Sequence, residues 1–380
     1  MAVNRILAPL PVDPTDPAAI LPNLEEAIAG RYTFLPLPAA DPTRAQLLKN
    51  SQAAGKAIDP TIALVVPTSG STGTPKGAQL TAANLVASAD ATHQRLGGPG
   101  QWLLAMPAHY IAGLQVLIRS LVAGVEPAWI DLSSGFDIDA FADAAEELHR
   151  TGDRAYTSLT PMQLSKAMDS DRGRDALRGF DAILVGGAAT HPHTLAAADK
   201  AGIKLVTTYG SSETAGGCVY DGYALPGTKV KIADGRIILG GPTIAHGYRN
   251  AADHEAFAEP GWFITSDSGY LDGNRLTVTG RLDNIIDSGG LKLHPEVLER
   301  EILSVPGVDT AAVTSIPHPR LGQAIVAAYT GTAAVGDILE GLADAGVPRW
   351  QIPKDLKRVD ALPMTSSGKV DRRAASELFR

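Results

Sequence analysis

The stretch T-S-G-S-T-G-T-P-K, from Thr68 to Lys76, consists of small, hydroxyl-bearing and turn-forming residues and one lysine. It follows Ile62 to Val66, a short apolar, largely β-branched run that predicts a buried strand. Glycines let a backbone approach a polyanion closely, while hydroxyls and a lysine add hydrogen bonds and positive charge. The order of these residues therefore indicates a phosphate-binding loop, although composition alone would favour a plain surface loop.

This loop is not a Walker A motif. That motif requires glycine before its lysine and a hydroxyl residue after it. Here Pro75 precedes Lys76 and Gly77 follows it. The P-loop class of nucleotide hydrolases is therefore not supported.

Length and composition limit the classes of protein that remain. The chain has 380 residues, of which 44% are hydrophobic and 19% charged, so we expect a globular protein of two or three domains. A net charge of −8 and the lack of a basic, aromatic-rich stretch disfavour a nucleic-acid partner. The single cysteine, Cys218, excludes an intrachain disulfide and a cysteine-based metal site, which fits a reducing cytoplasm.

Targeting to or across a membrane is not expected. The N-terminal apolar segment is short and rich in proline, unlike a signal peptide. The most apolar later segment, Ile111 to Ile130, is interrupted by Arg119 and Glu126. It therefore predicts a buried helix and strand, with no insertion into a membrane.

The fold class expected is α/β, with a large N-terminal domain over residues 1–283 and a small α+β domain over residues 284–380. Strand-like and helix-like runs alternate up to about Gly222, which predicts a wound α/β arrangement. Short strands then predict a β-rich subdomain. The predicted strands are Trp102–Met106, Glu126–Ile130, Ala155–Ser158, Ala182–Val185, Lys204–Thr208, Lys229–Ile232, Arg236–Leu239, Arg275–Val278, Val308–Ser315 and Ala324–Tyr329. The predicted helices are Leu24–Ile28, Thr43–Gly55, Leu80–Leu96, Ile138–Arg150, Pro161–Met168 and Pro295–Ile302.

Further motifs follow the loop in a fixed order. They are Y-G-S-S-E-T at Tyr209–Thr214, W-F-I-T-S-D at Trp262–Asp267, G-R-L-D-N at Gly280–Asn284 and G-K-V-D-R at Gly368–Arg372. Together with T-S-G-S-T-G-T-P-K-G, this series resembles the adenylate-forming superfamily over roughly residues 61–380. That superfamily contains acyl- and aryl-CoA ligases, luciferases and carrier-protein adenylation domains. The resemblance implies an enzyme that uses ATP, Mg²⁺ and, in the ligases, coenzyme A, and whose N-terminal domain is here shortened.

The resemblance also implies roles for particular residues. Ser212 would contact the α-phosphate, Glu213 would hold Mg²⁺, and Lys369 would be the catalytic lysine. Two positions depart from the family pattern, since Ser212 replaces the usual threonine and Ser266 the usual glycine. The remaining nucleotide contacts would be Thr68, Ser69, Gly70, Ser71, Thr72, Gly73 and Lys76 for phosphate, Gly187, Ala188, Tyr209 and Gly210 for adenine, and Asp267 and Arg281 for ribose.

The start of the C-terminal domain carries the residues that the resemblance assigns to coenzyme A. Asp283 would be the hinge, and Gly289 and Gly290 would line the pantetheine tunnel after rotation. A side chain at Gly290 would then block the thiol.

The shortened N-terminus indicates which carboxylic acid the enzyme would activate. A phosphate loop that begins as early as Thr68 is similar to short actinobacterial o-succinylbenzoate–CoA ligases of menaquinone biosynthesis, as are the stretches at Met106–Leu121 and Ser158–Leu164. That acid has two carboxylates, and the one not activated needs a buried partner. The candidates for contact with the acid are His109, Arg119, Ser158 and Lys166.

Two other functions stay open at this point. One is another aryl- or acyl-CoA ligase, and the other is a free-standing adenylation enzyme that loads a carrier protein. A non-catalytic relative is disfavoured because Glu213 and Lys369 are both present. The partners expected are therefore a small carboxylic acid, ATP and coenzyme A, with a homo-oligomer left open.

Overall fold

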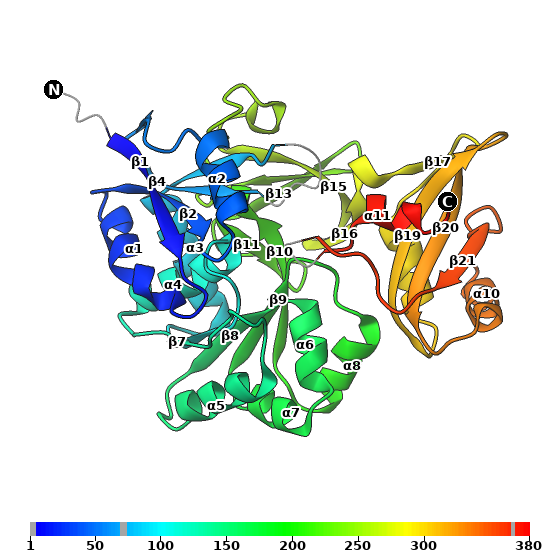
Figure 1. Cartoon of the computed structure of the whole chain (residues 1–380), viewed down its shortest axis with the longest axis horizontal. Helices are drawn as coiled ribbons and strands as arrows, with labels where there is room; N and C mark the ends of the chain where they lie inside the picture. The colour runs from blue at the N-terminus through cyan, green and yellow to red at the C-terminus, as the bar shows by residue number, and fades with distance from the viewer. Residues whose placement is uncertain (1–4, 69–73, 366–368) are drawn as a thin grey trace.

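The computed structural model describes residues 5–68, 74–365 and 369–380, which form three β-sheets with helices packed against them (Figure 1). The first sheet has the strand order β3-β1-β2-β4-β5. The second has eleven strands in the order β13-β14-β15-β16-β12-β11-β10-β9-β8-β6-β7. The third has the order β18-β17-β20-β19, with β21 paired to β20.

The first sheet carries the phosphate loop between its last two strands. The predicted strand before the loop is confirmed as β4, in which every residue is buried. Helices α1 (Leu21–Ile28) and α2 (Pro42–Ser51) connect the strands of this sheet. The strands are β1 (Arg5–Val12), β2 (Thr33–Pro38), β3 (Ala57–Ile58), β4 (Ile62–Pro67) and β5 (Gly77–Thr81).

Strands β1 and β2 were not predicted, because four prolines interrupt their apolar runs. Pro9 and Pro11 in β1, and Pro36 and Pro38 in β2, are each spaced two residues apart. Successive residues of a strand direct their N–H groups to opposite edges of that strand. Two prolines spaced two residues apart therefore both lack an N–H at the same edge. The two strands pair with each other along their length, whereas β4 meets β2 only at Phe34. The sheet tolerates these prolines because the edge at which they lack an N–H forms few hydrogen bonds with a neighbouring strand.

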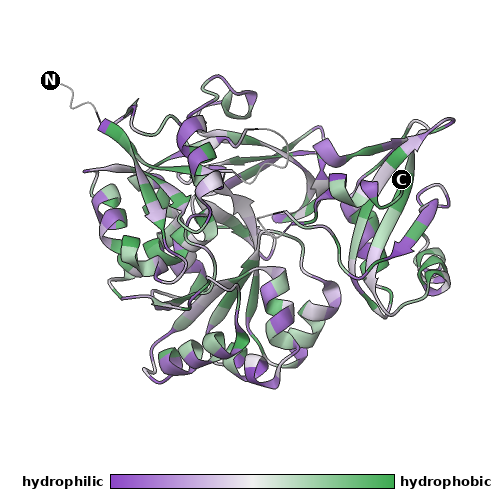
Figure 2. Ribbon diagram, viewed as in Figure 1, coloured by the Kyte–Doolittle hydropathy of each residue, from purple (hydrophilic) through white to green (hydrophobic). Residues whose placement is uncertain are grey.

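The second sheet begins as a parallel α/β layer. Strands β7, β6, β8, β9 and β10 are parallel, and helices α5 to α8 cover one face, seen below the sheet in Figure 1. Strand β9 is largely hydrophobic (Figure 2), and every residue of β8 is buried, as expected for strands covered on both faces. The elements are α3 (Ala82–Leu96), β6 (Gln101–Leu104), α4 (Ile111–Ala123), β7 (Ala128–Trp129), α5 (Ile138–His149), β8 (Ala155–Leu159), α6 (Pro161–Met168), α7 (Asp171–Arg178), β9 (Ala182–Gly186), α8 (Pro192–Lys200) and β10 (Leu205–Ser211).

The β-rich segment continues the same sheet. Strands β10 and β11 are antiparallel, and the bridge between Tyr223 and Arg275 joins β12 to β16. The predicted strands of this segment are confirmed, but they extend the central sheet instead of forming one of their own. They are β11 (Gly216–Tyr220), β12 (Tyr223–Ala224), β13 (Lys229–Ala233), β14 (Arg236–Gly240), β15 (Trp262–Asp272) and β16 (Arg275–Arg281).

The third sheet lies on the right of Figure 1, after a short 3-10 helix at Leu282–Asn284. It has its own hydrophobic core, in which Ile302, Val313 and Ile338 are fully buried. Among the described residues, no helix is long and apolar enough to cross a membrane. The elements are β17 (Ile286–Ser288), β18 (Leu291–Leu293), α9 (Pro295–Leu303), β19 (Val308–His318), β20 (Gly322–Gly331), α10 (Val335–Asp344), β21 (Asp355–Arg358) and α11 (Arg372–Glu377).

Candidate active site

The base of the phosphate loop is held by backbone and side-chain hydrogen bonds. The N–H of Thr68 donates to the carbonyl of Lys76 at 2.7 Å, which closes the loop. The Pro75 carbonyl accepts from Gln52 Nε2 at 2.7 Å and from Asn250 Nδ2 at 2.9 Å. The predicted contacts Ser69, Gly70, Ser71, Thr72 and Gly73 lie outside the described residues.

Lys76 points from this loop toward the Y-G-S-S-E-T motif. Its Nζ lies 2.7 Å from His254 Nε2 and 5.1 Å from the centre of the Tyr248 ring. The Tyr248 hydroxyl in turn donates to Glu213 Oε1 at 2.6 Å. Burial and the Glu213 charge raise the pKa of Tyr248 well above its usual value, so the hydroxyl stays a donor. Tyr248 and His254 were not identified from the sequence, because Tyr248 lies within, and His254 just after, a G-Y-R-N stretch at Gly247–Asn250 that matched none of the motifs.

The Y-G-S-S-E-T motif turns sharply at the end of β10. Gly210 lies so close to the neighbouring strand that a Cβ there would stand 2.1 Å from the Gly216 carbonyl oxygen. The next residues enter a 3-10 turn at Ser212–Thr214, in which both Ser212 and Glu213 are buried. Glycine is therefore required at Gly210 for the turn that presents Glu213 to Tyr248.

Tyr209 precedes that turn and holds Asp267. Its hydroxyl donates to Asp267 Oδ2 at 2.7 Å, and Arg281 Nη1 lies 3.5 Å from Asp267 Oδ1. Burial raises the pKa of Asp267, although the Tyr209 hydrogen bond and the Arg281 and Lys369 charges lower it. Arg281 also binds Asp283, with Nε donating to Oδ1 at 2.8 Å. The structure thus brings the predicted ribose contacts, the adenine contact Tyr209 and the predicted hinge into one group.

Lys369 reaches this group from the end of the chain. Burial and the Arg281 charge lower its pKa, whereas the carboxylates of Asp267 and Glu213 raise it, and the net shift is downward. Figure 1 shows the red segments on either side of residues 366–368 extending from the C-terminal part toward β16 and β10. The first and last motifs of the chain therefore meet at one site.

The segment after Lys369 is anchored by an ion-pair network. The guanidinium of Arg372 binds Glu299, with Nη2 donating to Oε2 at 2.9 Å, and also Glu296 at 3.1 Å. It donates to the Val313 carbonyl as well, at 2.6 Å. These contacts fix the position of the C-terminal helix α11 against α9 and β19.

Gly289 and Gly290 lie apart from this group, in the exposed turn between β17 and β18. Their φ angles are +66° and +84°, a left-handed conformation that glycine adopts without strain. Gly290 N–H donates to Asp287 Oδ1 at 2.8 Å, and a Cβ at Gly290 would meet nothing within 4 Å. In this structure the left-handed backbone of the turn is a sufficient reason for glycine at both positions.

The predicted contacts with the acid fall into different environments. Arg119 is 3% exposed, with its guanidinium 4.8 Å from the Trp102 ring and 3.4 Å from the Tyr220 hydroxyl. Lys166 is exposed and donates to the Phe136 carbonyl at 2.7 Å. Ser158 is buried in β8, and His109 is partly buried at the start of α4. Gly187 and Ala188 are exposed between β9 and α8, at the same edge of the sheet as Tyr209.

Helix α4 presents a polar stripe to β11. Ile111 and Gln115 lie against Gly216, and one turn further Arg119 lies against Tyr220. Among the described residues, neither Gln115 Oε1 nor Arg119 Nε has a hydrogen-bond partner, although both atoms are buried. Buried polar atoms are normally paired, so these two are suited to a polar group from a ligand or water.

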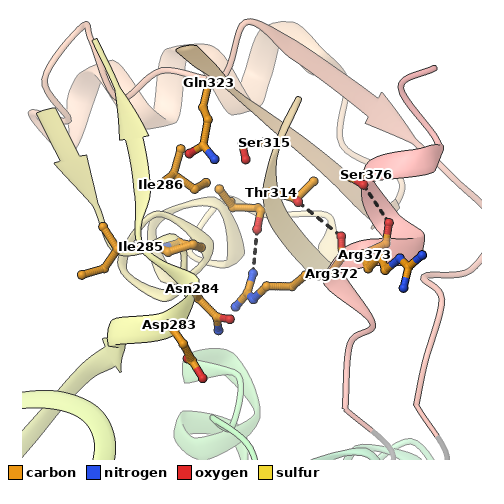
Figure 3. Close-up of a pocket in the computed structure, with 12 residues that line it drawn as sticks. Asp283, Asn284, Ile285, Ile286, Thr314, Ser315, Gln323, Arg372, Arg373 and Ser376 are labelled. Atoms are coloured by element: carbon orange, nitrogen blue, oxygen red, sulfur yellow. Dashed lines mark hydrogen bonds between the residues drawn. The ribbon is translucent and has the colours of Figure 1, made fainter. Parts of the chain in front are cut away.

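Two cavities of the described residues lie elsewhere. One, of about 230 Å³, lies beside Asp283 and is lined by Thr314 and Arg372 (Figure 3). Arg372 is already held by the carboxylates of α9. The other, of about 250 Å³, lies beside Asp90 and His93. The first cavity shares Asp283 with the motif cluster, but neither cavity is lined by Tyr209, Glu213, Asp267 or Lys369, so we define the site by that cluster.

No group of three or more His, Cys, Asp or Glu side chains within the described ranges could hold a metal. Glu213 is a lone carboxylate, next to the phosphate loop. Mg²⁺ is commonly held by one or two carboxylates together with substrate phosphates and water. The residues present therefore fit Mg²⁺ bound with a nucleotide and do not form a metal cage of their own.

The chain is similar to known proteins along most of its length. Residues 11–249 match the family model described as AMP-binding enzyme, and residues 297–369 match the AMP-binding enzyme C-terminal domain. A probable 2-succinylbenzoate–CoA ligase of Mycobacterium tuberculosis is 45% identical over 371 residues, which cover 95% of each chain.

Solved structures share the fold at lower identity. The o-succinylbenzoate CoA synthetase of Bacillus subtilis, in complex with its acyl-adenylate intermediate, is 22% identical with a TM-score of 0.82, over 98% of this chain and 88% of that one. ATP-bound MatB from Rhodopseudomonas palustris is 21% identical with a TM-score of 0.84, over 100% and 90%.

Proposed function

The chain belongs to the family of AMP-binding enzymes, and we propose that it activates 2-succinylbenzoate with ATP and joins it to coenzyme A for menaquinone biosynthesis. The 45% identity to the probable ligase of Mycobacterium tuberculosis supports this acid. The observation in the structure that carries the proposal is the buried Arg119, whose charge has no carboxylate partner among the described residues. An acid with a second carboxylate supplies that partner.

In the first half-reaction, a carboxylate of the acid attacks the α-phosphate of ATP, and pyrophosphate leaves. Negative charge builds up on the phosphate oxygens, so fixed cations and dipoles must stabilise it. We assign Lys369 and Ser212 to the α-phosphate, and Thr68 and Lys76 to the departing phosphates, because these residues lie at the motif cluster. Mg²⁺ on Glu213 would neutralise phosphate charge. Asp267, held by Tyr209, would accept from the ribose hydroxyls together with Arg281.

In the second half-reaction, the thiol of coenzyme A attacks the acyl-adenylate and AMP leaves. The structure places Lys369 at the site and the Gly289–Gly290 turn away from it. We propose that residues 284–380 rotate as a domain relative to residues 1–283, with Asp283 as the hinge. Rotation would replace Lys369 by Gly290 and so separate the two half-reactions, as hinge closure does in many enzymes.

The polar stripe of α4 supports the binding mode of the acid. Gln115 lies against Gly216, three residues after Glu213. Arg119 lies about 6 Å further along the helix, against Tyr220. The activated carboxylate would sit near Ser212, and the second carboxylate would bind Arg119. Lys166 is exposed and faces the Phe136 carbonyl, which favours Arg119 as the partner.

The test is formation of the CoA thioester with ATP and Mg²⁺, followed by mass spectrometry. The acids are 2-succinylbenzoate, benzoate, a medium-chain fatty acid and an amino acid. Product with 2-succinylbenzoate alone supports the proposal, and product only with another acid refutes the substrate. Pyrophosphate release without a CoA product would instead indicate a carrier-protein acceptor. The single, buried Cys218 supports a reducing compartment, and we place the enzyme in the cytoplasm.

A further inference from the structure

Among the described residues, two sets of hydrogen bonds that do not involve Lys369 join the two sides of the proposed hinge. Some lie next to Asp283 along the chain or in the adjoining strand. Ser268 Oγ is 3.3 Å from His294 Nδ1, and Arg300 Nη2 donates to the Thr279 carbonyl at 3.3 Å. A second group joins the N-terminus of α8 to the first residue of β19. That contact is made by His191 and is remote from the hinge in sequence.

The hydrogen bonds of His191 define its tautomer. Nδ1 accepts from the backbone N–H of His193 at 3.0 Å, so the ring proton is on Nε2. Nε2 lies 3.3 Å from the carbonyl oxygen of Val308 and donates to it. Burial lowers the pKa of His191, which favours the neutral ring that this arrangement requires. The exposed His193 contributes its backbone N–H, and its ring lies edge-on to the His191 ring with centroids 6.3 Å apart.

The distance of Val308 from the hinge makes this contact sensitive to rotation. Asp283 lines the same cavity as Thr314 and Ser315 in the middle of β19 (Figure 3). Val308 is six residues before Thr314, which corresponds to about 20 Å along the strand. Rotation of the C-terminal part by about 10° about the hinge would therefore move Val308 by about 3 Å. A hydrogen bond of 3.3 Å does not survive such a displacement.

We propose that His191 is a positioning residue, which holds the C-terminal part in the orientation that brings Lys369 to the site. The His191–Val308 contact must open before the Gly290 turn can approach, so it sets the balance between the two half-reactions. This inference rests on the proposed two-orientation mechanism. It assigns to the start of α8 a role in orientation that is separate from nucleotide contact.

The first test compares His191→Ala with the matched control His193→Ala. The control keeps the backbone N–H that His191 accepts from. Adenylation is followed as pyrophosphate release, and thioester formation is started from preformed 2-succinylbenzoyl-adenylate and coenzyme A. In His191→Ala the ratio of the adenylation rate to the thioester rate falls by about 2- to 10-fold, the range for one hydrogen bond. It is unchanged in His193→Ala. An unchanged ratio in His191→Ala, or an equal loss of both rates, overturns the inference.

The second test uses a covalent crosslink, and its crosslinking step needs no acid. A His191→Cys/Asp309→Cys protein is treated with a short bis-maleimide, while the native Cys218 is protected by burial. Rapid crosslinking is expected, and the crosslinked protein keeps adenylation and loses thioester formation at least 10-fold. Failure to crosslink, or thioester formation at the unmodified rate, overturns the inference. Failure of the unmodified enzyme to adenylate 2-succinylbenzoate would instead refute the proposed substrate, and the crosslinking yield would still test the contact.

Discussion

Replacing Arg119 by methionine should raise the stability of the fold and impair use of the acid. The guanidinium is buried, and burial lowers its pKa because the charged form is poorly solvated there. Its contact with the Trp102 ring is worth about 0.5–2 kcal/mol, whereas removing an ion from water costs several kcal/mol. The Tyr220 hydroxyl keeps Thr92 Oγ1 at 2.9 Å as a partner. We therefore expect Arg119→Met to increase the free energy of unfolding by about 1–3 kcal/mol.

The same substitution removes the proposed partner of the second carboxylate. Truncating one member of a buried, hydrogen-bonded charge pair costs about 2–5 kcal/mol in binding. This corresponds to a fall in kcat/KM for 2-succinylbenzoate of roughly 30- to 5,000-fold. An analogue that lacks the second carboxylate cannot use Arg119, so its kcat/KM should change little.

The assay combines thermal unfolding with steady-state kinetics on 2-succinylbenzoate and on each of its two monocarboxylate analogues. Lys166→Met is the matched control, because Lys166 is exposed and should affect neither quantity. A lower unfolding temperature in Arg119→Met, with an equal loss on 2-succinylbenzoate and on the analogue that keeps the activated carboxylate, would show that Arg119 has a structural role. If Lys166→Met instead lowers kcat/KM only for 2-succinylbenzoate, then Lys166 binds the second carboxylate.

Three further outcomes are expected. Lys369→Ala should abolish adenylation but spare thioester formation from preformed adenylate, and Gly290→Leu should do the reverse; equal losses of both half-reactions in both variants would contradict rotation about the hinge. Burial lowers the pKa of His109 to about 4, so below pH 6.5 the unfolded chain binds a proton that the folded chain does not, and stability should fall between pH 6.5 and 4 by up to about 3 kcal/mol. Denaturant titrations should show a smaller fall in His109→Gln. The idea fails if the free energy of unfolding changes with pH equally in the variant and in the unmodified protein. Burial raises the pKa of Cys218 to about 12, so a thiol reagent at pH 8 should find no reactive cysteine until the protein unfolds, whereas fast labelling of the native protein would disprove its burial.

Residues close together in the sequence were sufficient to predict many of the helices and strands. Helix α6 has the predicted bounds because Pro161 occupies its first turn and Thr160 and Gln163 form a capping box. Helix α3 ends at the predicted Leu96 but begins at Ala82, two residues later than predicted, because Thr81 caps it. The strand before the glycine-rich loop was evident from its apolar run. Each of these features depends on residues within a few positions of one another.

Strands β1 and β2 were missed because local signals alone were misleading. A proline normally excludes a residue from the middle of a sheet. Whether it does so depends on which side of the strand has a partner, and that is set by residues far away in sequence. In β2 only Phe34 pairs with β4, so Pro36 and Pro38 remove no needed donor.

The sequence by itself determined the chemistry of this protein, because the order of the loop, the Y-G-S-S-E-T turn and the lysine motif is readable along the chain. Only the tertiary structure separated Arg119 from Lys166, since both are basic residues on helices. Packing of α4 against β11 buries the guanidinium of Arg119, whereas α6 leaves Lys166 in solvent. The meeting of Lys369 with Asp267, and the contact of His191 with Val308, likewise join segments more than 100 residues apart. Burial and charge act through space, and a linear pattern does not contain those distances.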